Sequence, residues 1–368
     1  MKSDIKYVGM KQMRFLFITH SAFSQYSCYK RAIGTGEALT ALGHEVYILV
    51  KDCAENRTRI GEEAPHCNPI YVNGGIFREI VAKLRALWRV RPDVIYLSAF
   101  SVHNLAGMHF LFPRARSIIE FNELYSEYPR KRRNWALWEL IALFEHKYIL
   151  CASMFLVRHF SEVSRKYFLK RNIVYLPFAF PDYLRPSRSI HERKTILFMA
   201  SLWKGYGIYE VLQAFELIVR KEAGVALEVI GKGEEYERVK EWVEEHKLND
   251  DIHVCGFVAE QDLNEHFSKA DVFVSPMHDT LQDRARCPSK IFYYIPYQKP
   301  IVTCKIGNPF DVLGEYGFYY RPDDVEDMAR AFIKAIEACD DFAYPDGFVA
   351  QHSWASRAKE LEKWMTNE

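Results

Sequence analysis

The sequence predicts an α/β protein with two doubly wound parallel-sheet domains that face a cleft. The chain has 368 residues, a length that suits about two domains. Short apolar runs alternate with segments of helical periodicity, which is typical of βαβ units and parallel sheets. Residues 177–189 hold three prolines and no periodic pattern, so they predict a linker between two such series.

The first series runs from the N-terminus to this linker. Its apolar runs predict strands at residues 14–19, 45–50, 93–97, 117–121 and 172–176. Helical spacing predicts helices at residues 31–42, 76–90 and 135–149. We expect residues 1–182 to form the first domain.

The second series begins after the linker. Strands are expected at residues 195–199, 226–230, 252–255, 271–275, 300–303 and 317–320. Helices are expected at residues 207–219, 234–246, 261–270, 325–339 and 354–365. We expect residues 183–352 to form the second domain and residues 353–368 to form a separate C-terminal helix.

Composition excludes several classes of protein. Hydrophobic residues make up 49% of the chain and charged residues 26%, which is ordinary for a globular protein and unlike disordered or collagen-like chains. No apolar run is long enough to span a membrane, and residues 1–13 show no secretory signal. The eight cysteines form no C-x-x-C pair, so we expect reduced core cysteines in a cytoplasmic protein and no bound metal.

The net charge of +1 hides an asymmetry. Residues 1–185 carry 27 Lys and Arg against 16 Asp and Glu, a net charge of +11, whereas the remainder carries 22 against 32, a net charge of −10. Such a split suggests two domains with different partners. The alternative is that the net charges of the two surfaces drifted apart without a functional reason.

Several predicted loops follow strands, where ligands of parallel sheets bind. Lys204 and Gly205 precede a helix whose free N–H groups suit a phosphate. Gly231 and Gly233 follow the next strand, and Gly256, Phe257 and Val258 the one after. Glycine lets the backbone approach a ligand, although each loop alone is also compatible with an ordinary turn.

The segment 275–300 is the densest in polar side chains. Pro288 suits the first turn of a helix that starts near Ser289. Arg284, Arg286 and Lys290 then gather where an anion would bind. A solvated basic loop is the alternative.

In their order along the chain, these segments resemble the nucleotide-sugar glycosyltransferases of the GT-B fold, especially glycosyltransferase family 4. The resemblance covers nearly the whole chain. It rests on residues 34–46, 201–205, 229–233, 255–258, 270–276, 288–294 and 299–302, and on Ser353 and Trp354 before the last helix. It implies two Rossmann-like domains and a C-terminal helix that crosses back to the first.

The resemblance also implies roles for residues. Lys204 would contact the donor diphosphate and act in catalysis; Gly205, Arg284, Arg286, Ser289 and Lys290 would bind phosphate. The nucleotide would lie against Gly231, Gly233, Gly256, Phe257, Val258 and Tyr293. Basic side chains and helix dipoles would stabilise the leaving diphosphate, so neither a cofactor nor a metal is expected.

This chain departs from the family at three places. The Glu-x7-Glu pair that usually precedes this helix falls on Ala285 and Tyr293, and Asp279 or Asp283 would replace the first glutamate. An arginine usually found near Ser201 is missing. The histidine that often follows the strand at 117–121 is Asn122 here.

Two histidines end strands on the cleft side. His20 is a candidate base in the first domain and His278 a candidate contact to donor or acceptor in the second. A structural role is the alternative for each.

The basic half holds two tryptophan-containing stretches, residues 83–91 and 130–144. Basic residues beside apolar helices suit an anionic membrane surface, and a buried core helix is the alternative. No motif suggests nucleic acid, and the oligomeric state stays open.

We therefore expect a hexosyltransferase of polysaccharide biosynthesis that is cytoplasmic, with peripheral contact to the inner face of the membrane as an option. It would move a sugar from a UDP- or GDP-sugar to a glycan or lipid-linked acceptor, with retention and without metal. The alternatives are a nucleotide-sugar epimerase and a catalytically weak sugar-nucleotide- or glycan-binding protein.

Overall fold

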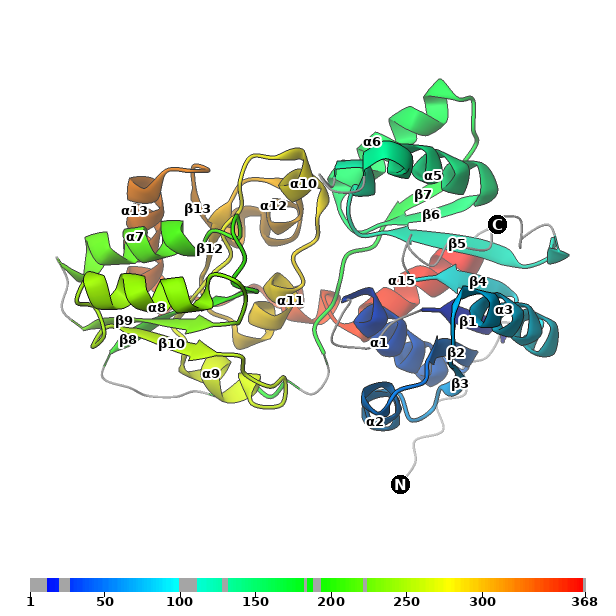
Figure 1. Cartoon of the computed structure of the whole chain (residues 1–368), viewed down its shortest axis with the longest axis horizontal. Coiled ribbons are helices and arrows are strands. Elements are labelled where there is room, and N and C mark those ends of the chain that lie inside the picture. Colours follow the sequence, from blue (N-terminus) through cyan, green and yellow to red (C-terminus); the bar gives the residue numbers. More distant parts are fainter. Residues whose placement is uncertain are drawn as a thin grey trace. The chain divides into compact units, whose positions relative to one another are not determined.

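A computed structural model describes residues 12–19, 27–98, 111–127, 132–181, 184–187, 193–220 and 224–366. The chain divides into two compact units (Figure 1). Unit 1 comprises residues 1–151, 157–176 and 354–368. Unit 2 comprises residues 152–156 and 177–353.

Unit 1 is built on a seven-stranded sheet in the order β3-β2-β1-β4-β5-β6-β7. The strands are β1 (Arg14–Ile18), β2 (Glu45–Lys51), β3 (Asn68–Val72), β4 (Val94–Leu97), β5 (Arg116–Phe121), β6 (Tyr148–Cys151) and β7 (Asn172–Tyr175). The helices are α1 (Ser27–Ala41), α2 (Ala54–Glu63), α3 (Ile76–Val90), α5 (Arg132–Glu145), α6 (Met154–Lys166) and α15 (Trp354–Thr366), with a short η3 (Tyr125–Glu127).

Unit 2 is built on a six-stranded sheet in the order β10-β9-β8-β11-β12-β13. The strands are β8 (Lys194–Met199), β9 (Val225–Ile230), β10 (Ile252–Gly256), β11 (Val272–Val274), β12 (Ile301–Cys304) and β13 (Phe318–Tyr320). The helices are α7 (Ile208–Val219), α8 (Tyr236–Glu245), α9 (Leu263–Lys269), α10 (Leu281–Ala285), α11 (Lys290–Tyr294), α12 (Gly307–Leu313), α13 (Val325–Ala338) and α14 (Phe348–Gln351), with short η4 (Ile295–Tyr297) and η5 (Gly314–Tyr316).

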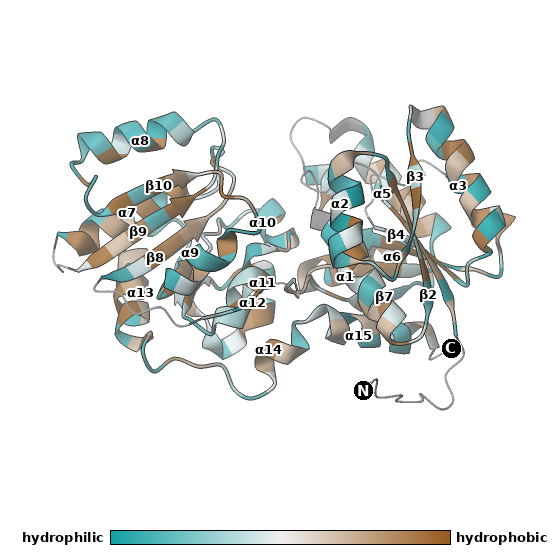
Figure 2. Cartoon of the chain, turned by 90° about the horizontal axis from the view of Figure 1, so that it is seen from below, coloured by the Kyte–Doolittle hydropathy of each residue, from teal (hydrophilic) through white to brown (hydrophobic). Residues whose placement is uncertain are grey.

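The strand pairs of both sheets are parallel, which confirms the predicted fold class. Central strands such as β4 and β12 are buried along their whole length, since helices cover both faces of a parallel sheet. Figure 2 shows hydrophobic strands in each unit and a hydrophilic outer side on α8. Strand order reverses between β1 and β4 and between β8 and β11, and ligands bind at such switch points.

The C-terminal helix α15 belongs to unit 1, as the resemblance implied. It packs along α1, where a Cβ on Gly34 would lie 2.4 Å from the Trp354 ring nitrogen. The His44 ring bonds Glu362 at 2.9 Å, and Trp364 Nε1 donates to Asn172 at 2.8 Å. The last thirteen helical residues therefore complete the core of the first unit.

The sequence-based expectations did not include β3, β6, α2 or α6 of unit 1. The helix expected at 135–149 ends at Glu145, and Tyr148–Cys151 is the buried strand β6. Its apolar run continues that of the helix, so periodicity alone did not separate them. Strand β3 was missed because it holds Pro69 and is half exposed; it lies at the sheet edge, where proline is tolerated.

Candidate functional site

Three of the predicted loops of unit 2 are joined at the carboxyl ends of β8, β9 and β10. The backbone N–H of Leu202 donates to Lys232 O at 3.0 Å, and that of Gly231 donates to Gly256 O at 2.8 Å. A Cβ on Gly231 would lie 1.8 Å from Ala200 O, and one on Gly233 would lie 2.1 Å from Leu202 O. Only glycine permits this approach, so both glycines shape the site by packing the loops together.

The loop between β8 and α7 presents Lys204 and Gly205 to solvent. Gly207, at φ +78°, is the N-cap of α7 and packs on Pro276, where a Cβ would lie 2.6 Å from that ring. No side chain caps α7, so its first N–H groups and positive dipole end remain available to an anion. Trp203 and Tyr206 are also exposed on this loop by 49% and 39%; sequence reasoning passed over these aromatics.

The segment after β11 is organised by Asp283, which is buried. Its carboxylate accepts the His278 backbone N–H at 2.6 Å and pairs with Arg286 at 2.9 Å. Its own N–H donates to Thr280, the N-cap of α10. Asp283 therefore positions this loop. Its role as a replacement for the first glutamate stays a prediction.

Asp279 and Arg284 lie on the surface and pair with each other at 2.6 Å. The Arg284 guanidinium lowers the pKa of Asp279 through that hydrogen bond. A phosphate would have to compete with this carboxylate for Arg284. Arg286 differs, because its guanidinium lies 5.3 Å from the centre of the Tyr206 ring and so reaches the β8–α7 loop.

Lys290 begins α11, with Ser289 as its N-cap. The lysine is half-buried, and its Nζ lies 5.1 Å from the centre of the Phe198 ring on β8. Burial, followed by the nearby charge of Arg286, lowers the pKa of Lys290 to about 7. The Ser289 side chain makes no cap hydrogen bond.

His278 follows β11, one of the two strands that flank the switch point of unit 2. Its Nδ1 bonds Asp323 at 2.8 Å, whereas its Nε2 is buried and has no hydrogen-bond partner among the described residues. That atom would lie 3.9 Å from a Cβ on Gly207. The ring therefore offers one nitrogen toward the N-terminus of α7.

A carboxylate that the sequence reasoning missed lies beside Tyr293. The Tyr293 hydroxyl donates to Glu260, which comes from the loop after Gly256–Val258. On that loop Phe257 is 75% exposed. Glu260 lies 33 residues before Tyr293, so no spacing rule along one helix could have paired them.

In unit 1 the candidate residues are less fully described. His20 lies outside the described residues, together with residues 99–110 that follow β4. Asn122 follows β5 and is buried, and its Oδ1 has no hydrogen-bond partner among the described residues. Two residues earlier, on β5, Glu120 pairs with Arg31 at 2.7 Å and accepts a hydrogen bond from the Tyr96 hydroxyl at 2.8 Å. The side chains of Glu120 and Arg31 are fully buried.

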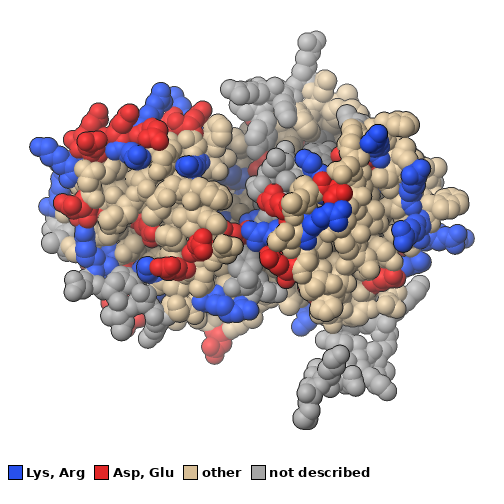
Figure 3. All heavy atoms as spheres, turned by 60° about the horizontal axis from the view of Figure 1, so that its bottom comes forward, with Lys and Arg blue, Asp and Glu red and all other residues tan. Residues whose placement is uncertain are grey.

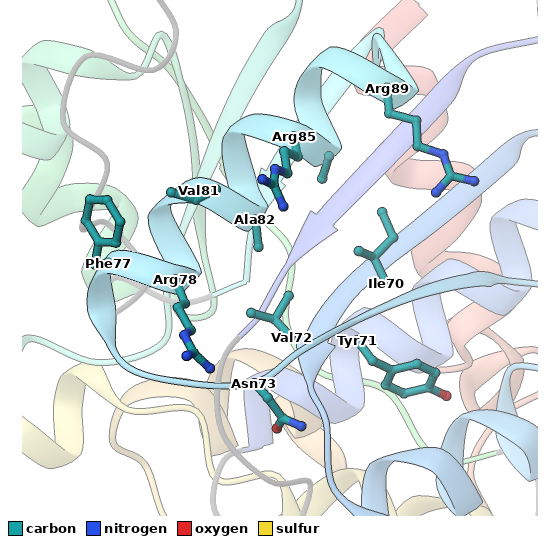
Figure 4. A pocket seen from close by; sticks show the side chains of 11 residues that line it. Ile70, Tyr71, Val72, Asn73, Phe77, Arg78, Val81, Ala82, Arg85 and Arg89 are labelled. Atoms are coloured by element: carbon teal, nitrogen blue, oxygen red, sulfur yellow. The ribbon is translucent and has the colours of Figure 1, made fainter.

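A groove of about 510 Å³ lies between β3 and α3 of unit 1. Its floor is apolar, with Ile70 and Val72 from the strand and Val81 from the helix. Figure 4 shows Arg78, Arg85 and Arg89 projecting from α3 on the strand side. In Figure 3 basic side chains gather on unit 1, while acidic ones gather over the α8 side of unit 2.

The two parallel-sheet units have the GT-B fold, which glycosyltransferases of known structure share. Residues 193–338 match the family described as "Glycosyl transferases group 1". The resemblance predicted from the sequence is therefore confirmed over residues 193–338, which lie in unit 2.

Similar solved structures share this fold at low identity. HepE of Anabaena, in complex with UDP and glucose, has a TM-score of 0.70 at 13% identity, covering 96% of this chain and 95% of its own. The pneumococcal O-GlcNAc transferase GtfA, with UDP and GlcNAc, has a TM-score of 0.70 at 10% identity, covering 97% and 99%. Sucrose-phosphate synthase of Thermosynechococcus elongatus has a TM-score of 0.68 at 15% identity, covering 97% and 95%.

A curated relative is an exopolysaccharide phosphotransferase of Streptomyces coelicolor, which is 26% identical over 164 residues. That stretch is 44% of this chain and only 17% of the relative. Among the described residues of our chain, no helix combines the length and apolarity needed to cross a bilayer.

Proposed function

We propose that this protein transfers a sugar from a nucleoside diphosphate sugar, UDP- or GDP-linked, to a glycan or lipid-linked acceptor. Unit 2 binds the donor and unit 1 the acceptor. The observation that carries the proposal is the placement of two cations near Lys204: Arg286 lies over Tyr206 of the β8–α7 loop, which bears Lys204, and Lys290 lies over Phe198 near the end of β8. These cations adjoin the switch point of a chain half with a net charge of −10.

The proposed chemistry needs stabilisation of a leaving diphosphate. Lys204, Arg286 and Lys290 supply positive charge, and the uncapped start of α7 supplies N–H donors. This set makes a bound metal unnecessary for the transfer, so the reaction continues in the presence of a chelator. Retention at the anomeric carbon is the outcome that we infer from the family resemblance.

Glu260 takes the place of the missing second glutamate of the Glu-x7-Glu pair. Its carboxylate is held by Tyr293, the residue that occupies that position in the sequence. A carboxylate there suits the hydroxyl groups of a ribose. Titration with UDP tests this role: Glu260→Gln weakens binding without lowering the unfolding midpoint, and an unchanged affinity contradicts the role.

Incubation with a panel of nucleotide sugars tests the function. Donor consumption that requires a second substrate supports sugar transfer, and the anomeric configuration of the product tests retention. Interconversion of the donor alone would identify an epimerase. Binding without turnover, across glycan and lipid-linked acceptors, would identify a binding protein, the alternative raised by the absent glutamate pair.

We propose further that α3 places unit 1 on an anionic membrane surface. Phe77 and Trp88 are 79% and 73% exposed and lie eleven residues, about three turns, apart on one stripe of the helix. Arg78, Arg85 and Arg89 lie beside that stripe. Aromatic side chains next to basic ones suit the headgroup region, where each Arg contributes about 1 kcal/mol.

Helix α5 of unit 1 also exposes apolar side chains. Leu137, Trp138 and Phe144 are 58%, 44% and 52% exposed. Residues 135–144 are therefore not buried along their whole length, in contrast to the core helix that was the alternative.

Vesicle flotation tests the membrane proposal. The protein floats with phosphatidylglycerol vesicles at low salt and does not float with phosphatidylcholine vesicles. Phe77→Ser with Trp88→Ser lowers the bound fraction several-fold, whereas Leu217→Ser, at an apolar residue of α7 in unit 2 that is 38% exposed, leaves it unchanged. Equal flotation of the double variant and the wild type would contradict a role for α3.

A further inference from the structure

Three potential metal ligands of different chemistry converge on one face of unit 2, outside the loops described above. They are Glu228 on β9, Cys255 on β10 and His266 on α9, and one ligand atom from each lies within 4.8 Å of the other two. The Cys255 thiol lies 3.3 Å from a Glu228 oxygen, and the His266 ring bonds that same oxygen. The sequence did not suggest this group, because its members lie 27 and 38 residues apart along the chain.

Local structure explains why the three side chains meet. Residues 252–254 of β10 pair with 227–229 of β9, and the register shifts between Val254 and Gly256. Cys255 is the extra residue of this bulge, and bulges re-aim side chains at sheet edges. The shift leaves Cys255 exposed on the side where Glu228 and the covering helix α9 present His266.

A second Cys, His and Glu group in the chain shows that proximity alone is not enough. In unit 1, His66 bonds one oxygen of Glu37, and the Cys67 sulfur lies 4.0 Å from the other oxygen. Their atoms flank the carboxylate instead of converging on one point. The cluster at Glu228 is the group of three ligands that converges among the described residues.

We propose that Glu228, Cys255 and His266 bind a divalent transition-metal ion of the zinc type. Sulfur, imidazole nitrogen and carboxylate oxygen are the ligands that zinc takes in proteins, and three protein ligands leave one position for water. A hard ion such as Mg²⁺ prefers oxygen ligands and fits this set poorly. Two anionic ligands and a neutral imidazole balance the charge of a divalent ion.

Binding requires the loss of a proton from sulfur. A cysteine thiol ordinarily carries its proton at neutral pH. The metal–sulfur bond forms as the S–H bond breaks, and one proton is released to solvent. His266 gives up its hydrogen bond to Glu228, the proton on Nδ1 passes through solvent to Nε2 of the same ring, and Nδ1 and the Glu228 carboxylate then each donate an electron pair to the metal. Affinity therefore rises with pH.

The ion would lie beside the glycine loops and outside the transfer reaction. Cys255 directly precedes Gly256, whose carbonyl accepts the N–H of Gly231. A metal held by β9, β10 and α9 ties this edge of the sheet together and restrains that hydrogen bond. Its expected effect is a higher unfolding temperature of unit 2, since a ligand that binds only the folded state stabilises it.

Titration of the full chain with Co²⁺ and Zn²⁺ tests the proposal. Co²⁺ produces a saturable thiolate-to-metal charge-transfer band at one equivalent, and Zn²⁺ removes it. Cys255→Ser abolishes the band. His266→Ala and Glu228→Gln each weaken metal affinity by at least roughly 10- to 100-fold, which is the loss expected when a hydrogen-bond partner of a metal ligand is removed. Calorimetry in buffers of different ionisation enthalpy detects the released proton.

His246→Ala is the matched control, because His246 bonds Glu216 at 2.9 Å in the same unit and belongs to no convergent group of three among the residues that the structure describes. It leaves the band and the affinity unchanged. A band that persists in Cys255→Ser, or Zn²⁺ binding that is equal in all variants, would show adventitious metal only and overturn the proposal. Since Cys255 is exposed, its serine variant folds, and the unfolding midpoint without metal verifies this.

Discussion

Replacing Lys290 with methionine lowers sugar transfer by roughly 10²- to 10³-fold, the loss expected when one group that stabilises a developing anion is removed. The side chain starts α11 and lies over Phe198 at the end of β8, beside Arg286. Methionine keeps the apolar stem and removes only the charge. Lys204→Met reduces transfer as well, because that lysine lies on the β8–α7 loop that the diphosphate meets.

The pH dependence of donor binding identifies Lys290 as the group responsible. Burial lowers the pKa of this lysine to about 7, so free protein loses the charge above that pH. A diphosphate binds the protonated form, and its binding takes up a proton. UDP affinity therefore falls by roughly tenfold per pH unit above 7 in the wild type, and this slope disappears in Lys290→Met. Isothermal titration between pH 6 and 9 measures it.

The stability of Lys290→Met distinguishes its loss of activity from misfolding. The pKa of Lys290 is lower in the folded than in the unfolded chain, so the unfolded chain binds more protons above pH 7 and stability rises with pH in that window. Lys290→Met lacks this rise and is at least as stable as the wild type at neutral pH. Lys305→Met, a lysine that also lies over aromatic rings in unit 2, is the matched control. Normal turnover in Lys290→Met would contradict the assignment.

Replacing Arg31 with methionine destabilises unit 1 by about 3–5 kcal/mol, because it leaves the buried Glu120 carboxylate without its cation. The two side chains are fully buried and 2.7 Å apart. Burial already raises the pKa of Glu120, and loss of Arg31 raises it further. A carboxyl with a raised folded pKa costs stability as pH rises, so the variant is less impaired at pH 5 than at pH 8.

Hydrogen exchange of the β4 and β5 amides measures this effect in unit 1 alone. Arg57→Met is the control, since the Arg57–Asp52 pair is exposed and such pairs contribute at most about 1 kcal/mol. The double variant Arg31→Met with Glu120→Gln recovers much of the loss. Equal protection in Arg31→Met and Arg57→Met would show that the buried pair does not support the fold.

Much of the fold could be predicted because buried apolar residues recur at regular intervals along helices and strands. Helix α3 begins and ends where its periodicity predicts, and strands β2 and β8 fall within one residue of the expected ends. Prediction failed where the pattern is shared or interrupted. The run at 148–151 continues a helix, and Pro69 interrupts an edge strand.

The candidate site shows the same division. The sequence pointed to Lys204, Gly231 and Gly233 because each follows a strand and has a residue type suited to phosphate or to close backbone approach. It pointed to Lys290 because that cation lies at the start of a helix. The partners of these residues were not found. Asp283 holds its own loop, Glu260 reaches Tyr293 from another loop, and Cys255 meets His266 through a bulge and a helix.

The sequence by itself determined the two doubly wound sheets, the loops that carry the cations and the division of charge between the halves. These properties depend on local periodicity, on turn residues and on composition, which neighbours along the chain specify. Only the tertiary structure decided that Arg31 neutralises Glu120, that Lys290 has a lowered pKa and that three ligands converge at Glu228. Burial and pairing between distant residues set those properties, and the linear sequence does not contain those distances.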